Sequence, residues 1–341
     1  MKRLVISSPN KVSAEKKSVP EPGAGEVLIR VAYCGICGSD IHAFQGKHPF
    51  IPLPATPGHE FSGTIVDTGS GVSGFEKGDR VICEPNLICG ECYNCKTGRY
   101  NICENLRVMG CQGEGAMADY FAAPADKTIA IPDRLSLRDA VLVEPLAVGV
   151  HAARKGGDLF GKNVVIIGAG TIGLMTLASV AKSGAKRIIV TDLSDNRLKT
   201  AKKLGATRII NAAGTDIVDK LLSSKPYEGY DVVFECVGIE KSIRDAIAIV
   251  RKGGRVVVCG VFGSETTVRM ADVQDRELEL IGSIMYIRRD ITDAVDLLAD
   301  GYCPADLFLS KEFSLDEAER AFSAALDTRN NVKVVFKIAG E

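Results

Sequence analysis

The sequence predicts an α/β protein made of two parts that differ in their patterns of apolar and turn residues. In residues 1–140, short β-branched runs alternate with glycine and proline turns, which is typical of antiparallel strands. From residue 163 onward, unbroken apolar runs alternate with helical segments, a pattern typical of a doubly wound parallel sheet. A group of closely spaced cysteines interrupts the first part and marks a separate loop excursion.

The first part contains five predicted strands, separated by turn residues such as Pro-Gly and Gly-Asp. An antiparallel, barrel-like domain is therefore expected rather than βαβ units. The cysteine-rich lobe at 86–105 lies between the third and fourth strands. The strands are expected at 26–32, 60–68, 80–84, 118–123 and 127–131.

A helical pattern at 141–153 opens the second part and ends at a Gly-Gly pair. The run at 163–167 shows no polar alternation, as expected for a parallel strand that is buried on both faces. Helical segments also precede the strands that begin at 231 and 254. The remaining elements are helices at 172–183 and 195–204 and strands at 187–191, 231–236, 254–261 and 278–283.

The tail after residue 286 holds two predicted helices, the second at 315–326, and a final strand at 332–338. This segment is too short to form a domain of its own. We therefore expect it to return and complete the first domain.

Composition excludes several classes of function. Hydrophobic residues make up 46% and charged residues 25% of the 341-residue chain, as in ordinary globular enzymes. The net charge of −1 leaves no basic surface for nucleic acid or an anionic membrane. No apolar run is long enough to span a bilayer, and no secretory leader opens the chain, so a cytoplasmic protein is expected.

The most specific chemical motif is a C-x2-C-x2-C-x7-C run formed by Cys89, Cys92, Cys95 and Cys103. Four thiolates at this spacing can surround one ion tetrahedrally, and zinc is the common occupant of closed sulfur sites. A disulfide framework is disfavoured, because the chain has an odd number of cysteines, eleven. A ferredoxin-type cluster would need a shorter last gap and a following proline. We therefore expect a structural zinc.

Residues 168–173 read Gly-Ala-Gly-Thr-Ile-Gly and match the G-x-G-x-x-G pattern. The pattern alone is weak, but here it follows a predicted strand and opens a helix, as a dinucleotide-binding turn requires. Gly168 permits the tight turn, Gly170 lets the backbone approach a pyrophosphate, and Gly173 lets the helix pack closely on the strand. Unpaired N–H groups at the helix start then bind the phosphates.

Asp192 ends the next predicted strand. Its carboxylate can accept both ribose hydroxyls of NAD and would repel the 2′-phosphate of NADP. Arg197 complicates this preference, because a basic residue five positions later can offset the repulsion. A helix cap is the alternative role for Asp192, although Ser194 or Asp195 fits it better. With NAD favoured over NADP, the candidate cofactor residues are Gly168, Gly170, Thr171, Ile172, Gly173, Asp192 and Arg197.

A second set of possible metal ligands is scattered along the sequence. Cys37 lies in Cys-Gly-Ile-Cys-Gly-Ser-Asp-Ile-His, and His59 and Glu60 follow a Pro-Gly turn. Glu144 lies among apolar residues at the start of a predicted helix, where a carboxylate needs a partner such as a cation. Cys34 and Cys37 form a C-x-x-C pair that suggests redox chemistry, but such a pair in a β-rich setting is poor evidence for it. The residues alone leave both interpretations open.

Nearly the whole chain resembles the zinc-dependent medium-chain dehydrogenases, the family of liver-type alcohol, sorbitol and threonine dehydrogenases. The matching motifs, in the family's order, are Cys-Gly-Ile-Cys-Gly-Ser-Asp, Pro-Gly-His-Glu, the four-cysteine run, Val-Glu-Pro-Leu-Ala and Gly-Ala-Gly-Thr-Ile-Gly. The resemblance implies a GroES-like β-barrel-type catalytic domain at 1–148 that carries the zinc lobe. It further implies a Rossmann NAD-binding domain at 149–285 and a return segment at 286–341.

The resemblance also implies ligands for a catalytic zinc. Cys37 and His59 match family ligands, and Glu60 matches the carboxylate that binds the metal in sorbitol-type members. Glu144 stands where liver-type enzymes have cysteine and polyol and threonine enzymes have glutamate, which argues against a primary alcohol as substrate. Whether Glu60, Glu144 or each in turn completes the sphere stays open. The cysteine lobe, which animal sorbitol dehydrogenases lack, favours the microbial polyol or diol branches.

Two residues near Cys37 match the family's proton relay. Ser39 matches the hydroxyl beside the metal and His42 the base that passes the proton to solvent, and with Glu144 they form the expected catalytic set. Asp40 is expected to orient the ring of His59. The alternative roles are a turn residue for Ser39, a surface imidazole for His42 and a helix cap for Asp40. The implied reaction is reversible oxidation of a secondary alcohol to a ketone, with hydride transfer to NAD.

The substrate is less clearly defined by the sequence. Met285, Tyr286, Arg288 and Arg289 follow the last predicted sheet strand, where sorbitol-type relatives form part of the substrate pocket. Arginines there could hold a carboxylate or a phosphate, but we favour a solvated helix start. A polyol, sugar alcohol or vicinal diol is expected, and a threonine-like amino alcohol or a sugar acid is the alternative.

The resemblance implies two zinc ions per chain and a homo-oligomer, tetramer or dimer, joined near residues 278–286. Nucleic acid and membrane are not expected as partners. A non-catalytic dinucleotide-binding protein is the alternative of a different class, but it would have no need for Cys37, His59 or the cysteine lobe.

Overall fold

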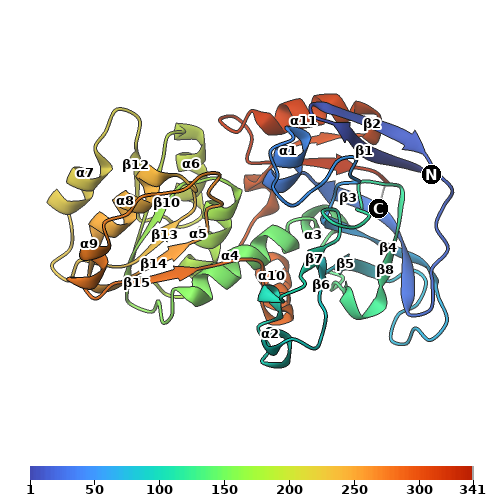
Figure 1. Cartoon of the computed structure of the whole chain (residues 1–341), viewed down its shortest axis with the longest axis horizontal. Helices are drawn as coiled ribbons and strands as arrows, with labels where there is room; N and C mark the ends of the chain where they lie inside the picture. The colour runs from blue at the N-terminus through green and yellow to red at the C-terminus, as the bar shows by residue number, and fades with distance from the viewer. Residues whose placement is uncertain (340–341) are drawn as a thin grey trace. The chain divides into compact units, whose positions relative to one another are not determined.

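The computed structural model describes residues 1–339, which form two compact units (Figure 1). The first unit, here called the catalytic unit, comprises Met1–Glu144 and the chain from Ile287 onward. The second, here called the Rossmann unit, comprises Pro145–Tyr286. The chain thus leaves the catalytic unit once and returns to it. Among the described residues, no helix is long and apolar enough to cross a membrane.

A seven-stranded sheet forms the centre of the catalytic unit, in the order β16-β17-β3-β4-β5-β9 with β8 also paired to β3. All pairs are antiparallel except β16–β17, which is parallel because α11 crosses between them. The strands are β3 (Glu26–Gly35), β4 (Glu60–Thr68), β5 (Arg80–Cys83), β8 (Tyr120–Pro124), β9 (Thr128–Ala130), β16 (Leu309–Phe313) and β17 (Lys333–Lys337).

Smaller elements surround this sheet. The hairpin of β1 (Lys2–Ser8) and β2 (Lys11–Lys16) was not predicted, because five of the six β2 residues are exposed and show no apolar alternation. Figure 1 shows the short helix α2 of the cysteine lobe at the periphery of this unit. The remaining elements are α1 (Gly38–Phe44), β6 (Asn86–Leu87), α2 (Tyr93–Lys96), β7 (Arg107–Val108), α3 (Leu137–Ala140), α10 (Arg288–Ala299) and α11 (Ala318–Leu326).

The Rossmann unit contains a six-stranded parallel sheet in the order β12-β11-β10-β13-β14-β15. This is the 3-2-1-4-5-6 order of dinucleotide-binding folds, with the topological switch between β10 and β13. The strands are β10 (Asn163–Ile167), β11 (Arg187–Asp192), β12 (Arg208–Asn211), β13 (Tyr230–Glu235), β14 (Val250–Val258) and β15 (Glu279–Gly282). The helices are α4 (Val143–Lys155), α5 (Thr171–Lys182), α6 (Asp195–Lys203), α7 (Ile217–Ser223), α8 (Glu240–Ile249) and α9 (Met270–Gln274).

Most strands of this sheet match strands predicted from the sequence. Every residue of β10 is buried, as the absence of alternation indicated. The four-residue strand β12 was not predicted, because a run this short between turns has no periodicity. The fold class expected from the sequence, a GroES-like domain with a Rossmann sheet, is confirmed.

Candidate metal and cofactor sites

The four lobe cysteines converge on one point. The sulfur atoms of Cys89, Cys92, Cys95 and Cys103 all lie within 4.8 Å of one another. Cys89 Sγ lies 3.5 Å from Cys103 Sγ and 4.0 Å from Cys95 Sγ. A tetrahedral zinc with bonds of about 2.3 Å places its sulfur ligands about 3.8 Å apart. The lobe therefore fits a zinc ion without rearrangement.

Backbone N–H groups point at these sulfur atoms and favour their thiolate form. Cys92 N–H donates to Cys89 Sγ at 3.4 Å, and Cys95 N–H donates to Cys92 Sγ at 3.5 Å, where Cys92 caps α2. Backbone N–H groups of Glu104 and Cys95 lower the pKa of Cys92 below its ordinary value. The pKa of Cys95, by contrast, is raised to about 12 by burial and by its contacts with Cys92 and Cys103. Thiolates are the species that bind metal, so a bound cation would displace the proton of Cys95.

A second ligand group lies at the edge of the catalytic unit's sheet. One ligand atom from each of Cys37, His59 and Glu60 falls within 4.8 Å of the others. Strand pairing brings them together: Gly35 at the end of β3 is opposite Glu60 at the start of β4, and Cys37 follows as the N-cap of α1. His59 and Glu60 are only 6% and 1% exposed. A sulfur, an imidazole and a carboxylate at this distance fit a zinc that keeps an open position.

The carboxylate of Glu60 has a partner that the sequence did not reveal. Lys333 Nζ donates to both Oε1 and Oε2 at 2.7 Å, and the two side chains are 4% and 2% exposed. Lys333 Nζ also donates to the carbonyl of Ile36 at 3.1 Å, next to Cys37. A Cβ on Gly35 would lie 2.2 Å from Glu60 Oε2, so only glycine leaves room for this carboxylate. Lys333 therefore links both segments that supply the ligands.

Helix α1 carries the predicted proton relay. Ser39 lies in its first turn and the exposed His42 in its last turn. Ser39 Oγ is buried and has no hydrogen-bond partner in the described chain, as expected of a group whose partner is a bound ligand. Asp40 differs from the expectation. Its Oδ2 accepts the Cys37 N–H at 2.8 Å and so caps α1, while no hydrogen bond joins it to His59.

Glu144 lies in the first turn of α4 and is 8% exposed. It is not one of the three residues that the ligand-distance criterion groups at this site. Its charge nevertheless acts on the site. Burial lowers the pKa of Lys333, but the charges of Glu60, of Cys37 and, more weakly, of Glu144 raise it overall. The structure thus brings Glu60 to the two other ligands and leaves Glu144 close by.

Cys111 is a further neighbour of the ligand group. Burial lowers the pKa of His59, but the charge of Cys37 and the thiol of Cys111 in contact with the ring raise it well above its ordinary value overall. Neither Cys111 nor Lys333 stands in a motif of its own. Lys333 lies 273 residues from Glu60, so only the pairing of β17 with β3 shows that they meet.

The glycine-rich turn has the geometry that a dinucleotide requires. Gly168 has a φ of +97°, and a Cβ on Gly173 would lie 1.9 Å from the carbonyl oxygen of Gly168. Both positions therefore need glycine. At Gly170, the N-cap of α5, an added Cβ would have only one neighbour within 4 Å, Arg197 Nη1 at 3.9 Å. The space at the N-terminus of α5 is therefore open. Thr171 and Ile172 form the first turn of that helix, and the N-terminus of a helix attracts phosphate.

Asp192 is fixed beside this turn. Its Oδ2 accepts the Ala169 N–H at 2.7 Å and its Oδ1 accepts the Ser194 N–H at 2.8 Å. The helix cap is Ser194, whose side chain accepts from Arg197 N–H, so Asp192 does not serve as the N-cap. Arg197 Nη1 lies 3.8 Å from Asp192 Oδ2, and its buried Nε has no partner in the described residues. Both side chains therefore lie beside the glycine-rich turn.

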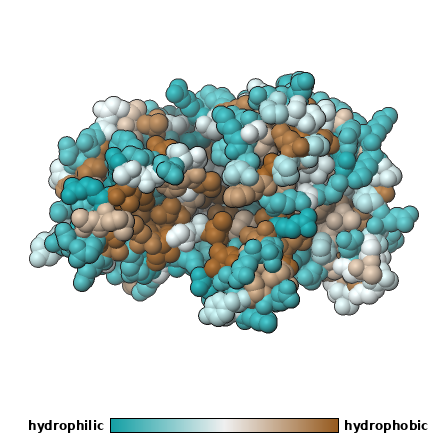
Figure 2. All heavy atoms as spheres, viewed as in Figure 1, coloured by the Kyte–Doolittle hydropathy of each residue, from teal (hydrophilic) through white to brown (hydrophobic). Residues whose placement is uncertain are grey.

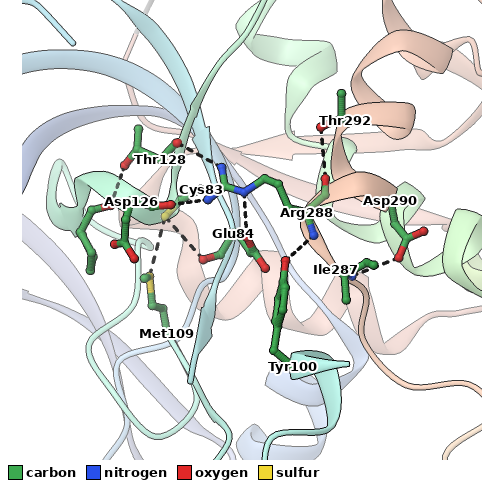
Figure 3. Close-up of polar contacts among 11 residues, drawn as sticks. Cys83, Glu84, Tyr100, Met109, Asp126, Thr128, Ile287, Arg288, Asp290 and Thr292 are labelled. Atoms are coloured by element: carbon green, nitrogen blue, oxygen red, sulfur yellow. Dashed lines mark hydrogen bonds and ion pairs between the residues drawn. The ribbon is translucent and has the colours of Figure 1, made fainter. Parts of the chain in front are cut away.

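Arg288 is held by several polar contacts within the catalytic unit (Figure 3). Its Nε pairs with the buried carboxylate of Glu84 at 3.0 Å, its guanidinium donates to the carbonyls of Thr128 and Asp126, and its backbone N–H donates to Tyr100 Oη. The favoured prediction of a helix start is correct for Arg288, the first residue of α10, but its side chain is only partly solvated, because it pairs with the buried Glu84. The prediction is also correct for the exposed Arg289.

Comparison with known proteins identifies the family. Residues 23–133 match the alcohol dehydrogenase GroES-like domain, and residues 171–300 match the zinc-binding dehydrogenase domain. A sorbitol dehydrogenase of Bacillus subtilis is 35% identical over 97% of this chain and 95% of its own. The chain belongs to the zinc-type alcohol dehydrogenases.

Other members of the family are also similar to this chain. An L-threonine 3-dehydrogenase of Chromobacterium violaceum is 35% identical over 90% of this chain and 91% of its own. A zinc-binding dehydrogenase from Sinorhizobium meliloti, solved with NADP, has a TM-score of 0.90 at 32% identity and 98% coverage of both chains. An alcohol dehydrogenase from Escherichia coli, solved with NADH, has a TM-score of 0.92 at 29% identity and 99% coverage of both. This zinc-type dehydrogenase thus acts on an alcohol with a nicotinamide cofactor.

Proposed function

We propose that this dehydrogenase oxidises the secondary alcohol of a polyol, sugar alcohol or vicinal diol to a ketone, with NAD as the hydride acceptor. The observation that carries the proposal is the convergence of Cys37, His59 and Glu60, next to the unpartnered hydroxyl of Ser39. A second zinc belongs to the cysteine lobe, so two zinc ions per chain are proposed. The sorbitol dehydrogenase relative supports a polyol substrate.

The proposed roles follow from position and chemistry. Cys37, His59 and a carboxylate from Glu60 or Glu144 hold the catalytic zinc. When bound, zinc lowers the pKa of an alcohol and the dinucleotide accepts a hydride. Ser39 accepts the substrate's hydroxyl proton, and His42, exposed at the end of α1, releases it to solvent.

The contact of Lys333 with Glu60 affects whether Glu60 or Glu144 is expected to bind the metal at rest. Glu60 can approach a metal only by weakening two short bonds to a buried ammonium group. This supports Glu144 as the resting ligand, with Glu60 as the group that exchanges with water or substrate. The proposal keeps both residues in the metal site.

For the cofactor, the carboxylate of Asp192 supports NAD, because it disfavours a 2′-phosphate. Arg197 lies within reach of the same ribose, so NADP is proposed as a weaker substitute. The relatives solved with NADP and with NADH are consistent with either cofactor in this family.

Edge strand β15 is proposed to join subunits in a dimer or tetramer. Unpaired edge strands with apolar side chains favour association. Leu280 and Ile284 are 37% and 56% exposed, and Figure 2 shows hydrophobic side chains gathered over the region of β14 and β15. None of the eleven cysteines forms a disulfide, which suits a reducing compartment such as the cytoplasm.

A substrate screen tests the proposal. Purified zinc-loaded enzyme is assayed for NADH and NADPH formation with sorbitol, 2,3-butanediol, L-threonine and a sugar acid. The proposal predicts the highest kcat/KM for a polyol or diol with NAD. Preference for L-threonine would assign the alternative substrate class, and a lack of turnover with every alcohol would contradict the proposed enzyme.

A further inference from the structure

Two cysteines outside both metal sites stand side by side at the carboxyl edge of the Rossmann sheet. Glu235 at the end of β13 pairs with Val258 at the end of β14, so Cys236 and Cys259 are the next pair along the same two strands. Both cysteines are partly exposed and reduced. Their position is the edge of the sheet where open α/β folds bind ligands.

The backbone holds the two thiols close together. Cys259 N–H and Gly260 N–H both donate to the carbonyl of Glu235, at 2.8 and 3.0 Å. The thiol of Cys259 lies near enough to that of Cys236 to raise its pKa. A Cβ on Gly260 would lie 2.2 Å from Gly238 N, so the turns that follow the two strands touch. Opposite residues on adjacent strands are about 4.8 Å apart, within the Cα separation that a disulfide spans.

Cys236 also contacts the glycine-rich turn. Its N–H donates to the carbonyl of Ile167 at 2.9 Å, directly before that turn. A Cβ on Gly168 would lie 3.2 Å from the carbonyl oxygen of Cys236, and a Cβ on Gly173 would lie 3.5 Å from its Cβ. A movement of Cys236 toward Cys259 therefore acts on the residues that shape the phosphate site.

We propose that Cys236 and Cys259 form a reversible disulfide that lowers the affinity of the Rossmann unit for its dinucleotide. The affinity part rests on the proposed cofactor site, whereas disulfide formation does not. The oxidant is a hydroperoxide, here hydrogen peroxide. One thiol attacks the peroxide, the O–O bond breaks, and a sulfenic acid and one water molecule form. The second thiol then attacks the sulfenic sulfur, the S–S bond forms, and a second water leaves.

The disulfide does not depend on the order of these steps. Contact with Cys259 and burial together raise the pKa of Cys236 well above its ordinary value. Either thiol can attack the peroxide first, because the two steps give the same disulfide in both orders.

Peptide mapping of the zinc-loaded enzyme tests the bond itself. After treatment with hydrogen peroxide and alkylation, trypsin releases residues 221–241 and 256–269, each with one of the two cysteines. We expect these peptides to be linked and to separate after dithiothreitol. Cys259→Ser should abolish the linked species, whereas Cys303→Ser, which changes a buried cysteine elsewhere, should retain it. A failure to find the linked peptides in the wild-type enzyme would overturn the proposal.

Titration with NADH tests the effect on binding. The oxidised wild-type enzyme should bind NADH about fivefold or more weakly than the reduced enzyme, with full recovery after dithiothreitol. By linkage, saturating NADH should make the disulfide harder to form, and a fivefold effect raises the reduction potential of the disulfide, measured in a glutathione buffer, by about 20 mV. Equal affinities in the two states would refute the regulatory effect. An absence of dinucleotide binding even in the reduced enzyme would refute the proposed function. Formation of the disulfide would then still be tested independently by peptide mapping.

Discussion

Replacement of Lys333 by methionine probes the buried pair at the catalytic site. The change keeps most of the side-chain volume and removes the ammonium group. Glu60 then loses both 2.7 Å bonds, and the carbonyl of Ile36 loses its donor. Because both side chains are at most 4% exposed, solvent does not take over these contacts.

The size of the expected stability loss follows from this burial. Removal of one partner from a buried ion pair costs about 3–5 kcal/mol, because the other charge stays behind without compensation. For a unit of this size, 1 kcal/mol corresponds to about 2–4 °C in Tm. The zinc-free K333M variant should therefore unfold at least about 6 °C below the zinc-free wild type. The double variant K333M/E60Q should recover part of this loss, because no buried charge remains.

Differential scanning calorimetry of chelator-treated protein measures this effect. Lys337→Met is the matched control, since Lys337 is exposed on the same strand β17. Equal Tm values for K333M and K337M would refute the inference that Lys333 neutralises Glu60. The zinc-loaded K333M enzyme also tests the choice of ligand, because a freed Glu60 should bind the metal and slow its removal by chelators.

Three further substitutions test the other sites. Cys95→Ser should lower the zinc content by about one ion per chain and lower Tm, as measured by metal analysis and calorimetry; an unchanged zinc content would contradict the lobe site. Asp192→Ala should raise the KM for NAD about tenfold or more and lower that for NADP, because NAD loses a charge-assisted hydrogen bond and NADP loses a repulsive charge; equal effects on both cofactors would speak against the assigned ribose contact. Ser39→Ala should lower kcat about 100-fold with bound zinc retained, and wild-type turnover would remove Ser39 from the proton relay.

The sequence predicts the fold and the ligand-bearing motifs well, because each depends on local patterns. The four lobe cysteines and the turn at 168–173 lie within short segments, so spacing alone brings their groups together. The pairing of Glu60 with Lys333 depends instead on the returning strand β17, which no local pattern connects to β4.

Asp40 takes the alternative role that its motif offered, and Arg288 has a partner that its motif did not indicate. Asp40 caps α1, because the N-terminus of a helix offers a free N–H that a nearby carboxylate satisfies. Arg288 pairs with Glu84, a carboxylate at the end of β5 that is 1% exposed and must have a cation. Long-range charge pairing of this kind depends on tertiary burial, which the sequence pattern does not contain.

The central claim is that Cys37, His59 and a carboxylate hold a zinc ion on which turnover depends, apart from the zinc of the lobe. Metal analysis of Cys37→Ser beside Cys34→Ser tests it most directly, since Cys34 is in the same motif but outside the ligand group. We predict about one zinc per chain, intact NADH binding and no turnover for C37S, and two zinc ions with activity for C34S. Two tightly bound zinc ions and wild-type turnover in C37S would contradict the account.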